Sequence, residues 1–348
     1  MRELVHECFL GIYEMKLTQA NNEMNIFFIA GKENERSLMI DTGYRTAENQ
    51  QLLERLLTSL HVSYENLDIF LTHKHHDHIG LAEYFSNRGA TIYMNPVEDR
   101  HVYDCLSYNH NPKSVEEQLH VLHKAGINEM RTPELWQFLM RMTSYQRSTH
   151  KDGVFQTSAF PYKPIEIGQI FSYGAYTFEV ISLSGHTMGQ VGLYEPKHKL
   201  LFTGDQIIVG IVPIVGTSYI DEHLLQHYFA SLETIQMQYA DCTILPAHNE
   251  ILTNATPVIT HIVSSYRKKL SAMEQILANS KKSMTIQEMA FEAYGLAKTP
   301  LDAKHHFMIK MILTKTFSCL EYLCDIGFCK RTEEDGVLCY QYIPSSKT

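Results

Sequence analysis

The chain has 348 residues, of which 44% are hydrophobic and 20% are charged, and its formal net charge at pH 7 is −9. These values are typical of a globular protein with one large domain and one small one. No run of 18 apolar residues is present, and residues 1–8 lack the apolar core of a signal peptide, so we expect a cytoplasmic protein without a membrane partner. The seven cysteines form no Cys-x-x-Cys motif, which favours reduced, mostly buried thiols.

The first informative segment is a dense group of polar side chains between two apolar stretches. Residues 67–72 have the pattern of a buried strand, and an amphipathic helix is predicted to begin at Ile79. Between them lie four potential metal ligands: His73, His75, Asp77 and His78. Isolated histidines, such as His305 and His306 on a later helix, are usually solvated or partly buried residues. Imidazole and carboxylate groups at this close spacing instead suit zinc or a related divalent metal, so we predict a metal site on this loop.

The segment from about 97 to 164 is predicted to be a helical insertion. Helices are expected at 115–126, which ends at a glycine, and at 133–142, which begins with a proline. The second helix and the residues after it carry aromatic and methionine side chains, namely Trp136, Phe138, Met140, Met142 and Tyr145. This stripe has two interpretations: it lines an apolar substrate pocket, or it packs the helices onto the rest of the fold.

Three later segments repeat one layout, in which a short apolar strand ends in a single potential ligand near a glycine or proline. The three candidates are His186, Asp205 and His248. Because several strands are expected to deliver their ligands to one edge of a sheet, we predict that these residues meet the first group there. Residues 207–215 follow as a long uncharged run, which is interpreted either as a pocket wall or as an interior strand.

Residues 256–348 are predicted to form a separate unit. Two long helices are expected, at 257–277 and 304–326, with a shorter helix N-capped by Thr285 between them. An Asp-Gly pair at 335–336 predicts a β-hairpin. Helices followed by such a hairpin look like a winged helix.

With these positions in place, the chain resembles the metallo-β-lactamase superfamily. The resemblance covers roughly residues 20–255 and includes the strand and turn at 37–43 as well as every ligand candidate. It implies an α/β fold over residues 1–255, the four-layer αβ/βα sandwich, in which two mixed sheets pack face to face with helices outside. The ligand set is similar to that of glyoxalase II. The small C-terminal helical or winged-helix-like domain at 256–348 resembles the extension of the lactamase-beta-like group.

The resemblance also implies a role for each candidate ligand. Six residues would form two groups of three, one for each of two divalent metal ions: His73, His75 and His186, then Asp77, His78 and His248. Asp205 would bridge the two ions. Zinc is the first expectation, with iron or manganese as alternatives, because all three metals accept nitrogen and oxygen ligands.

This ligand set implies a hydrolase that acts on a small molecule. Two divalent ions lower the pKa of a shared water to about 7, and the resulting hydroxide attacks a small ester, thioester or lactone. Asp77 is the predicted catalytic residue, as a proton acceptor close to that hydroxide. The alternatives are a metal-dependent single-stranded ribonuclease, a mononuclear-iron enzyme similar to persulfide dioxygenases, and a binding or sensing protein with little turnover. A homodimer is a further expectation left open.

The charge of the C-terminal unit argues against a nucleic-acid partner. From Lys281 onward the chain carries nine Lys or Arg against eight Asp or Glu, and residues 333–335 at the predicted hairpin tip are all acidic. Phosphate binding needs a basic face, which this composition does not provide. We therefore expect the unit to pack on the hydrolase part, to border the active-site mouth or to make a dimer contact.

Overall fold

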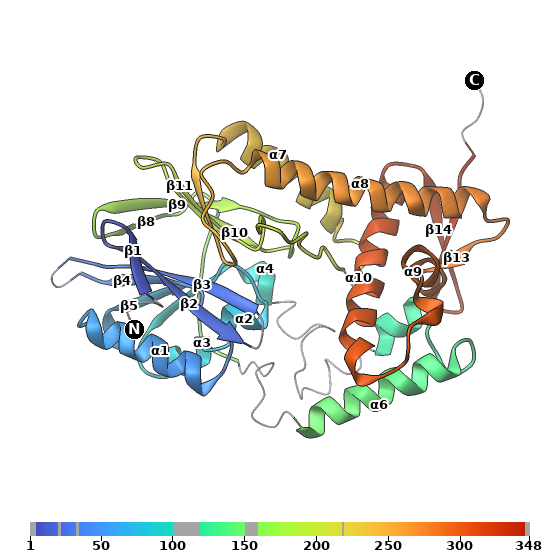
Figure 1. Ribbon diagram of the computed structural model, residues 1–348, viewed down its shortest axis with the longest axis horizontal. Helices are drawn as coiled ribbons and strands as arrows, with labels where there is room; N and C mark the ends of the chain where they lie inside the picture. Colours follow the sequence, from blue (N-terminus) through green and yellow to red (C-terminus); the bar gives the residue numbers. More distant parts are fainter. Residues whose placement is uncertain are drawn as a thin grey trace.

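Two large β-sheets lie face to face in the protein, and helices cover their outer faces and extend to one side (Figure 1). The computed structural model describes residues 5–19, 22–32, 35–99, 119–149, 159–217 and 219–344. Within these ranges, no helix combines the length and the apolar character that a bilayer crossing needs.

The first sheet has seven strands that neighbour one another in chain order, antiparallel from β1 to β4 and parallel from β4 to β7. Its strands are β1 (Val5–Phe9), β2 (Ile12–Gln19), β3 (Asn22–Ile29), β4 (Ser37–Ile40), β5 (Leu67–Phe70), β6 (Thr91–Met94) and β7 (Lys163–Pro164). The helical elements of this half are α1 (Ala47–Ser59), the 3₁₀ turn η1 (Tyr64–Asn66), α2 (His76–Ile79), α3 (Ala82–Ser86) and α4 (Pro96–Asp99).

The second sheet has five strands in the order β12-β11-β10-β9-β8, with one parallel pair, β11 and β12. Its strands are β8 (Ile170–Tyr173), β9 (Tyr176–Ser182), β10 (Val191–Glu195), β11 (Leu200–Gly204) and β12 (Thr243–Pro246). The helix α7 (Leu224–Gln238) connects β11 to β12 and lies on the outer face of this sheet.

Three apolar layers join the sheets and helices. In β3, Phe27 and Ile29 face the second sheet, whereas Ile26 and Phe28 face the helices α1 and α3, because successive side chains of a strand point to opposite faces. The outer face of the second sheet packs against α7 and α8 (Thr256–Asn279). The layers therefore run helices, sheet, sheet, helices, and the predicted four-layer sandwich is confirmed.

The C-terminal elements continue the outer layer of the second sheet. They are α8, α9 (Ile286–Tyr294), the 3₁₀ turn η2 (Leu296–Lys298), α10 (Ala303–Asp325) and a small sheet of β13 (Met284–Thr285), β14 (Cys329–Glu334) and β15 (Val337–Tyr342). The predicted cap of α9 is confirmed, because Thr285 and Glu288 form a reciprocal capping box. The hairpin turn is confirmed as well: Asp335 and Gly336 have φ of 52° and 77°. The winged-helix description and the two-domain division stay predictions.

The predicted helical insertion is described only in part. Residues 119–124 are helical, α6 spans Pro133–Thr149, and residues 100–118 and 150–158 lie outside the described ranges. Phe138 is buried in the core cluster that includes α8 and α10, and Trp136 and Met140 pack against that cluster. The packing interpretation of the aromatic stripe therefore holds for these three side chains; those of Met142 and Tyr145 lie outside the described part of the chain.

Two expectations need correction. His306 is fully buried on α10, not solvated or partly buried, because its ring packs edge-on against Phe138 of α6 at a centroid distance of 5.9 Å. The helix expected from Ile79 begins at His76 and is divided into α2 and α3. The division has a local cause, since the Thr42 hydroxyl donates to the His78 carbonyl and accepts from the Leu81 amide.

Candidate metal centre

The seven predicted site residues come from four strand ends. His73, His75, Asp77 and His78 follow β5 of the first sheet, whereas His186, Asp205 and His248 follow β9, β11 and β12 of the second. Because β11 and β12 are parallel neighbours, their carboxyl ends meet at one edge. The structure brings all seven side chains together at this end of the sandwich, in two groups.

The first group consists of His73, His75, His186 and one oxygen of Asp205. His75 Nδ1 lies 2.9 Å from His73 Nε2 and 3.0 Å from His186 Nε2. Asp205 Oδ2 lies 3.5 Å from His186 Nε2 and 4.0 Å from His73 Nε2. Three nitrogens and one oxygen thus converge on one small volume, and this is a donor set that zinc accepts.

The second group consists of Asp77, His78 and His248. His248 Nε2 lies 3.4 Å from Asp77 Oδ2, and His78 Nε2 lies 3.8 Å from Asp77 Oδ1. Asp205 Oδ1 lies 3.4 Å from Nε2 of both His78 and His248. Asp205 therefore presents one carboxylate oxygen to each group, which is the arrangement of a bridging ligand.

The burial of the donor atoms tests whether these residues fit divalent cations. His78 Nε2 and Asp205 Oδ1 are buried and have no hydrogen-bond partner among the described residues. A buried polar atom without a partner costs roughly 1–3 kcal/mol. A cation between the two would satisfy both atoms, so the residues of the second group fit a divalent metal ion.

Burial sets the protonation of the first group. It lowers the pKa of His73 well below its ordinary value and the pKa of His75 to about 3, and it also lowers the pKa of His186. The neighbouring imidazoles act in the same direction. All three rings are therefore neutral near pH 7, and neutral imidazole is the form that binds a metal.

Carboxylates set the protonation of the second group. Burial alone would lower the pKa of His248, but Asp205 and Asp77 outweigh it and raise the pKa to about 9. The same competition between burial and the carboxylates of Asp41 and Asp205 raises the pKa of His78. Without a metal, the protons on His78 and His248 compensate the negative charge of the buried carboxylates. Divalent ions replace such protons when a ligand set of this kind binds metal.

Asp41 orients His78 of the second group by contacting the ring nitrogen that does not face Asp205. Its carboxylate accepts hydrogen bonds from the backbone amide and the hydroxyl of Thr72, each at 2.8 Å, and its Oδ2 lies 2.8 Å from His78 Nδ1. These contacts leave His78 Nε2 directed at Asp205. Asp41 has a left-handed φ of 62°, a conformation in which Asp and Asn are enriched. Asp41 belongs to the strand and turn at 37–43, but its sequence position alone indicates no role for it.

Glu98 of α4 is a second residue that the sequence analysis missed. Its fully buried carboxylate accepts hydrogen bonds from the backbone amides of Lys74, at 2.9 Å, and Gly189, at 2.5 Å. It therefore ties the loop after β5 to the loop that carries His186. A Cβ at position 189 would lie 2.6 Å from a Glu98 oxygen, so a larger residue there would displace this carboxylate. No sequence signal marked Glu98, since it lies at the start of the predicted insertion.

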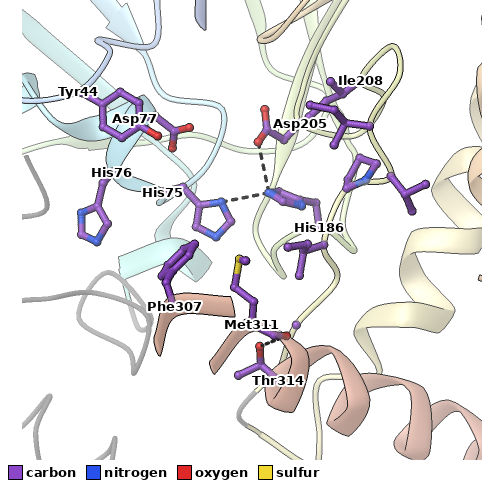
Figure 2. A pocket seen from close by; sticks show the side chains of 15 residues that line it. Tyr44, His75, His76, Asp77, His186, Asp205, Ile208, Phe307, Met311 and Thr314 are labelled. Atoms are coloured by element: carbon purple, nitrogen blue, oxygen red, sulfur yellow. Dashed lines mark hydrogen bonds and ion pairs between the residues drawn. The ribbon is translucent and has the colours of Figure 1, made fainter. Parts of the chain in front are cut away.

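A pocket of about 330 Å³ opens beside the two groups. Figure 2 shows His75, Asp77, His186 and Asp205 on one side of it and Phe307, Met311 and Thr314 of α10 on the other. The residues that complete the lining follow β4, β5 and β11 in the chain: Tyr44, His76, Ile208, Ile211, Val212, Pro213, Ile214 and Gly216. Of the two interpretations of residues 207–215, the structure therefore supports the pocket wall.

The sequence itself identifies the family of this fold and site. The family model for the metallo-beta-lactamase superfamily matches residues 24–278. The chain belongs to this superfamily. The predicted recognition is thus confirmed, and the match includes all seven site residues.

Curated relatives within the superfamily match a limited part of the chain. A lactamase-like protein from Pestalotiopsis fici is 27% identical over 141 residues, which are 38% of this chain and 42% of that protein. An atrochrysone carboxyl ACP thioesterase from Paecilomyces divaricatus is 25% identical over 41% of this chain and 46% of its own length. A hydroxyacylglutathione hydrolase from Brucella ovis is 27% identical over 36% of this chain and 46% of its own. The chain thus spans less than half the length of these relatives.

Solved structures of the superfamily match nearly the whole chain. A metallo-beta-lactamase family protein from Thermus thermophilus superposes with a TM-score of 0.74 over 97% of this chain and 100% of its own, at 18% sequence identity. A beta-lactamase domain protein from Burkholderia ambifaria has the same TM-score and identity and covers 97% of this chain and 94% of its own. At this identity the likeness shows the fold alone.

Proposed function

We propose that the chain is a dinuclear metal-dependent hydrolase of a small ester, thioester or lactone. The observation that carries the proposal is the position of Asp205, whose two carboxylate oxygens face two separate groups of ligand candidates at 3.4–4.0 Å. The names of two relatives, a thioesterase and a hydroxyacylglutathione hydrolase, agree with a thioester substrate.

Each of the two groups of candidate ligands would hold one metal ion. His73, His75 and His186 would hold one ion, and Asp77, His78 and His248 would hold the other, with Asp205 between them. When bound, two divalent ions supply a Lewis acid for the carbonyl oxygen and lower the pKa of a water that they share. Zinc fits this set of nitrogen and oxygen donors, and iron or manganese would fit it as well.

The chain's own residues supply the positioning and the proton transfer. The carboxylate of Asp77 lines the pocket, so it is placed to accept a proton from the attacking water. Asp41 and Glu98 fix the loops that carry the ligand candidates. Among the described lining residues there is no Ser or Cys, which agrees with direct attack by water rather than a covalent enzyme intermediate.

The alternatives have less support. A single-stranded ribonuclease would need cations for the phosphate backbone, but the described residues that line the pocket include no Lys or Arg. A mononuclear iron site would leave the second group without a metal, although Asp205 faces both groups at similar distances. A small-molecule substrate, a cytoplasmic location and a homodimer stay predictions.

Hydrolysis of a thioester and of a lactone by the zinc-loaded protein tests the proposal. We expect His75→Ala and Asp205→Asn to lower kcat/KM by at least about a hundredfold. Mutation of residues that only hydrogen-bond to metal ligands already lowers metal affinity or activity by about 10- to 100-fold. Asp241→Asn, a change at an exposed aspartate paired with Lys199, is the matched control and should leave the rate unchanged. Full activity of the Asp205→Asn protein would contradict the proposal.

A further inference from the structure

The far wall of the pocket is apolar except for Thr314, whose hydroxyl donates within its own helix, and it comes from two elements. One is α10, from which Phe307, Met311 and Thr314 contribute side chains at positions i, i+4 and i+7 of one helix face. The other is the loop after β11, from Ile208 to Ile214. Figure 2 shows Phe307 and Met311 across the pocket from Asp77 and Asp205.

The helix that carries this wall is held firmly. The opposite face of α10 is buried in the core through Ile309, Leu313, Phe317 and Leu320. In Figure 1, α10 lies between the sandwich and the outer C-terminal elements. The wall position is therefore set by the main core of this half of the molecule and not by a surface contact.

The loop after β11, which forms the other part of this wall, is also held by several contacts. The Tyr266 hydroxyl of α8 donates to the Pro213 carbonyl at 2.7 Å and accepts from the Val215 amide at 2.9 Å. The Asn249 side chain donates to the Val209 carbonyl at 2.7 Å. At Gly216 the loop approaches α10 so closely that a Cβ would lie 2.7 Å from the Thr314 hydroxyl. Both walls are thus pre-formed, which favours selection of ligands by shape and polarity.

The charges around the pocket restrict what it can bind. In the described lining, Lys and Arg are absent, and the carboxylates are those of Asp77 and Asp205, both assigned above to the metal groups. A carboxylate or phosphate on the part of the substrate that faces α10 would lose its water without gaining a charged partner. An aliphatic group there would gain contact with Ile211, Val212 and Met311.

We propose that this pocket binds an uncharged aliphatic acyl group and that α10 selects acyl esters or thioesters by chain length. This inference rests on the proposed function for its kinetic test, but the binding surface itself is described by side chains that take no part in metal binding. Each methylene buried against this wall should raise kcat/KM by about fourfold until the pocket is full.

The kinetic test uses a series of thioesters on the zinc-loaded protein: acetyl, butyryl, hexanoyl and octanoyl, with succinyl as the charged counterpart of butyryl. We expect kcat/KM to rise along the aliphatic series and to be at least about tenfold lower for succinyl than for butyryl. Equal rates for butyryl and succinyl, or a rate that does not rise with chain length, would overturn the inference while leaving the hydrolase proposal intact.

Variants test the role of α10. Met311→Trp should fill the pocket and lower the ratio of octanoyl to acetyl kcat/KM by about tenfold or more. Met237→Trp is the matched control, because Met237 is 76% exposed on α7 and lies outside the pocket lining. An unchanged ratio in the Met311→Trp protein would contradict the assignment of this wall.

A binding measurement separates the two proposals. Methyl octyl ketone is uncharged and cannot be hydrolysed, so calorimetric titration of the zinc-loaded protein measures the pocket without turnover. We expect saturable binding that Met311→Trp weakens about tenfold and Met237→Trp does not. If the ketone binds in this way but no ester, thioester or lactone is hydrolysed, the proposed function fails and the assignment of the pocket as a site for an uncharged aliphatic group stands. Absence of ketone binding overturns the inference.

Discussion

At the residue scale, Asp41 is the side chain on which the orientation of the second group depends. Its carboxylate accepts hydrogen bonds from the amide and the hydroxyl of Thr72 and lies beside His78 Nδ1, and it does so from a left-handed backbone conformation. Asp41→Asn keeps the size and tolerates the positive φ, but an amide has a single acceptor oxygen and cannot serve both partners. We expect the affinity for zinc to fall about 10- to 100-fold while the fold is retained.

Competition with a chromophoric chelator measures this affinity, and circular dichroism checks the fold. Asp241→Asn removes the same charge at an exposed position and should bind zinc like the wild type. Equal zinc affinity of the Asp41→Asn protein would show that Asp41 does not orient His78.

The individual residues of the site differ in whether the sequence predicts their position in it. That the seven candidate ligands come together was predictable, because histidines and aspartates that follow buried strands at that spacing are seldom needed for packing alone. The roles of Asp41 and Glu98 were not predictable. Each acts through partners from other strands or loops, and these contacts exist only after the loops have come together in the fold.

At the element scale, the contact between α10 and α6 buries the titratable side chain of His306. Its ring lies against Phe138, and both ring nitrogens are buried without a hydrogen-bond partner among the described residues. Burial, and to a smaller extent Lys310, lowers the pKa of His306 to about 4. In the unfolded chain its pKa is about 6.5, so between these values the unfolded state binds more protons. Its contribution to stability is therefore complete above pH 6.5 and is lost as the pH falls toward 4.

His306→Leu removes this dependence and keeps the site apolar. We expect the loss of unfolding free energy between pH 6.5 and pH 4.5 to be roughly 1–3 kcal/mol smaller in this variant than in the wild type. Urea denaturation at each pH measures it. His261→Leu, at an exposed position of α8, is the control and should follow the wild type. The same pH dependence in the wild type and the His306→Leu protein would contradict the account.

Elements differ in how far their sequences determine them. The capping box at Thr285 and the hairpin turn at Asp335-Gly336 are local, so their residues alone predict them correctly. The division between α2 and α3 is not local, because it depends on a hydroxyl of Thr42 from another strand end. His306 shows the same limit, since its burial results from the docking of α6 on α10.

At the scale of the whole molecule, the pocket is formed by parts that are far apart in the sequence. The candidate ligands come from the sandwich, and the opposite wall comes from α10, more than fifty residues after the last of them. From the sequence, the C-terminal unit was expected to pack on the hydrolase part, to border the active-site mouth or to make a dimer contact. The sequence alone does not distinguish these arrangements, because the periodicity of a helix predicts an apolar face but not the partner of that face.

We propose above that the two groups joined by Asp205 bind two metal ions. Elemental analysis of the purified protein, after zinc reconstitution and removal of free metal, counts these ions. We predict two equivalents of zinc per chain in the wild type and in the Asp241→Asn control, and fewer than two in the Asp205→Asn protein. Saturation at a single equivalent in the wild type, or two retained equivalents in the Asp205→Asn protein, would contradict the account.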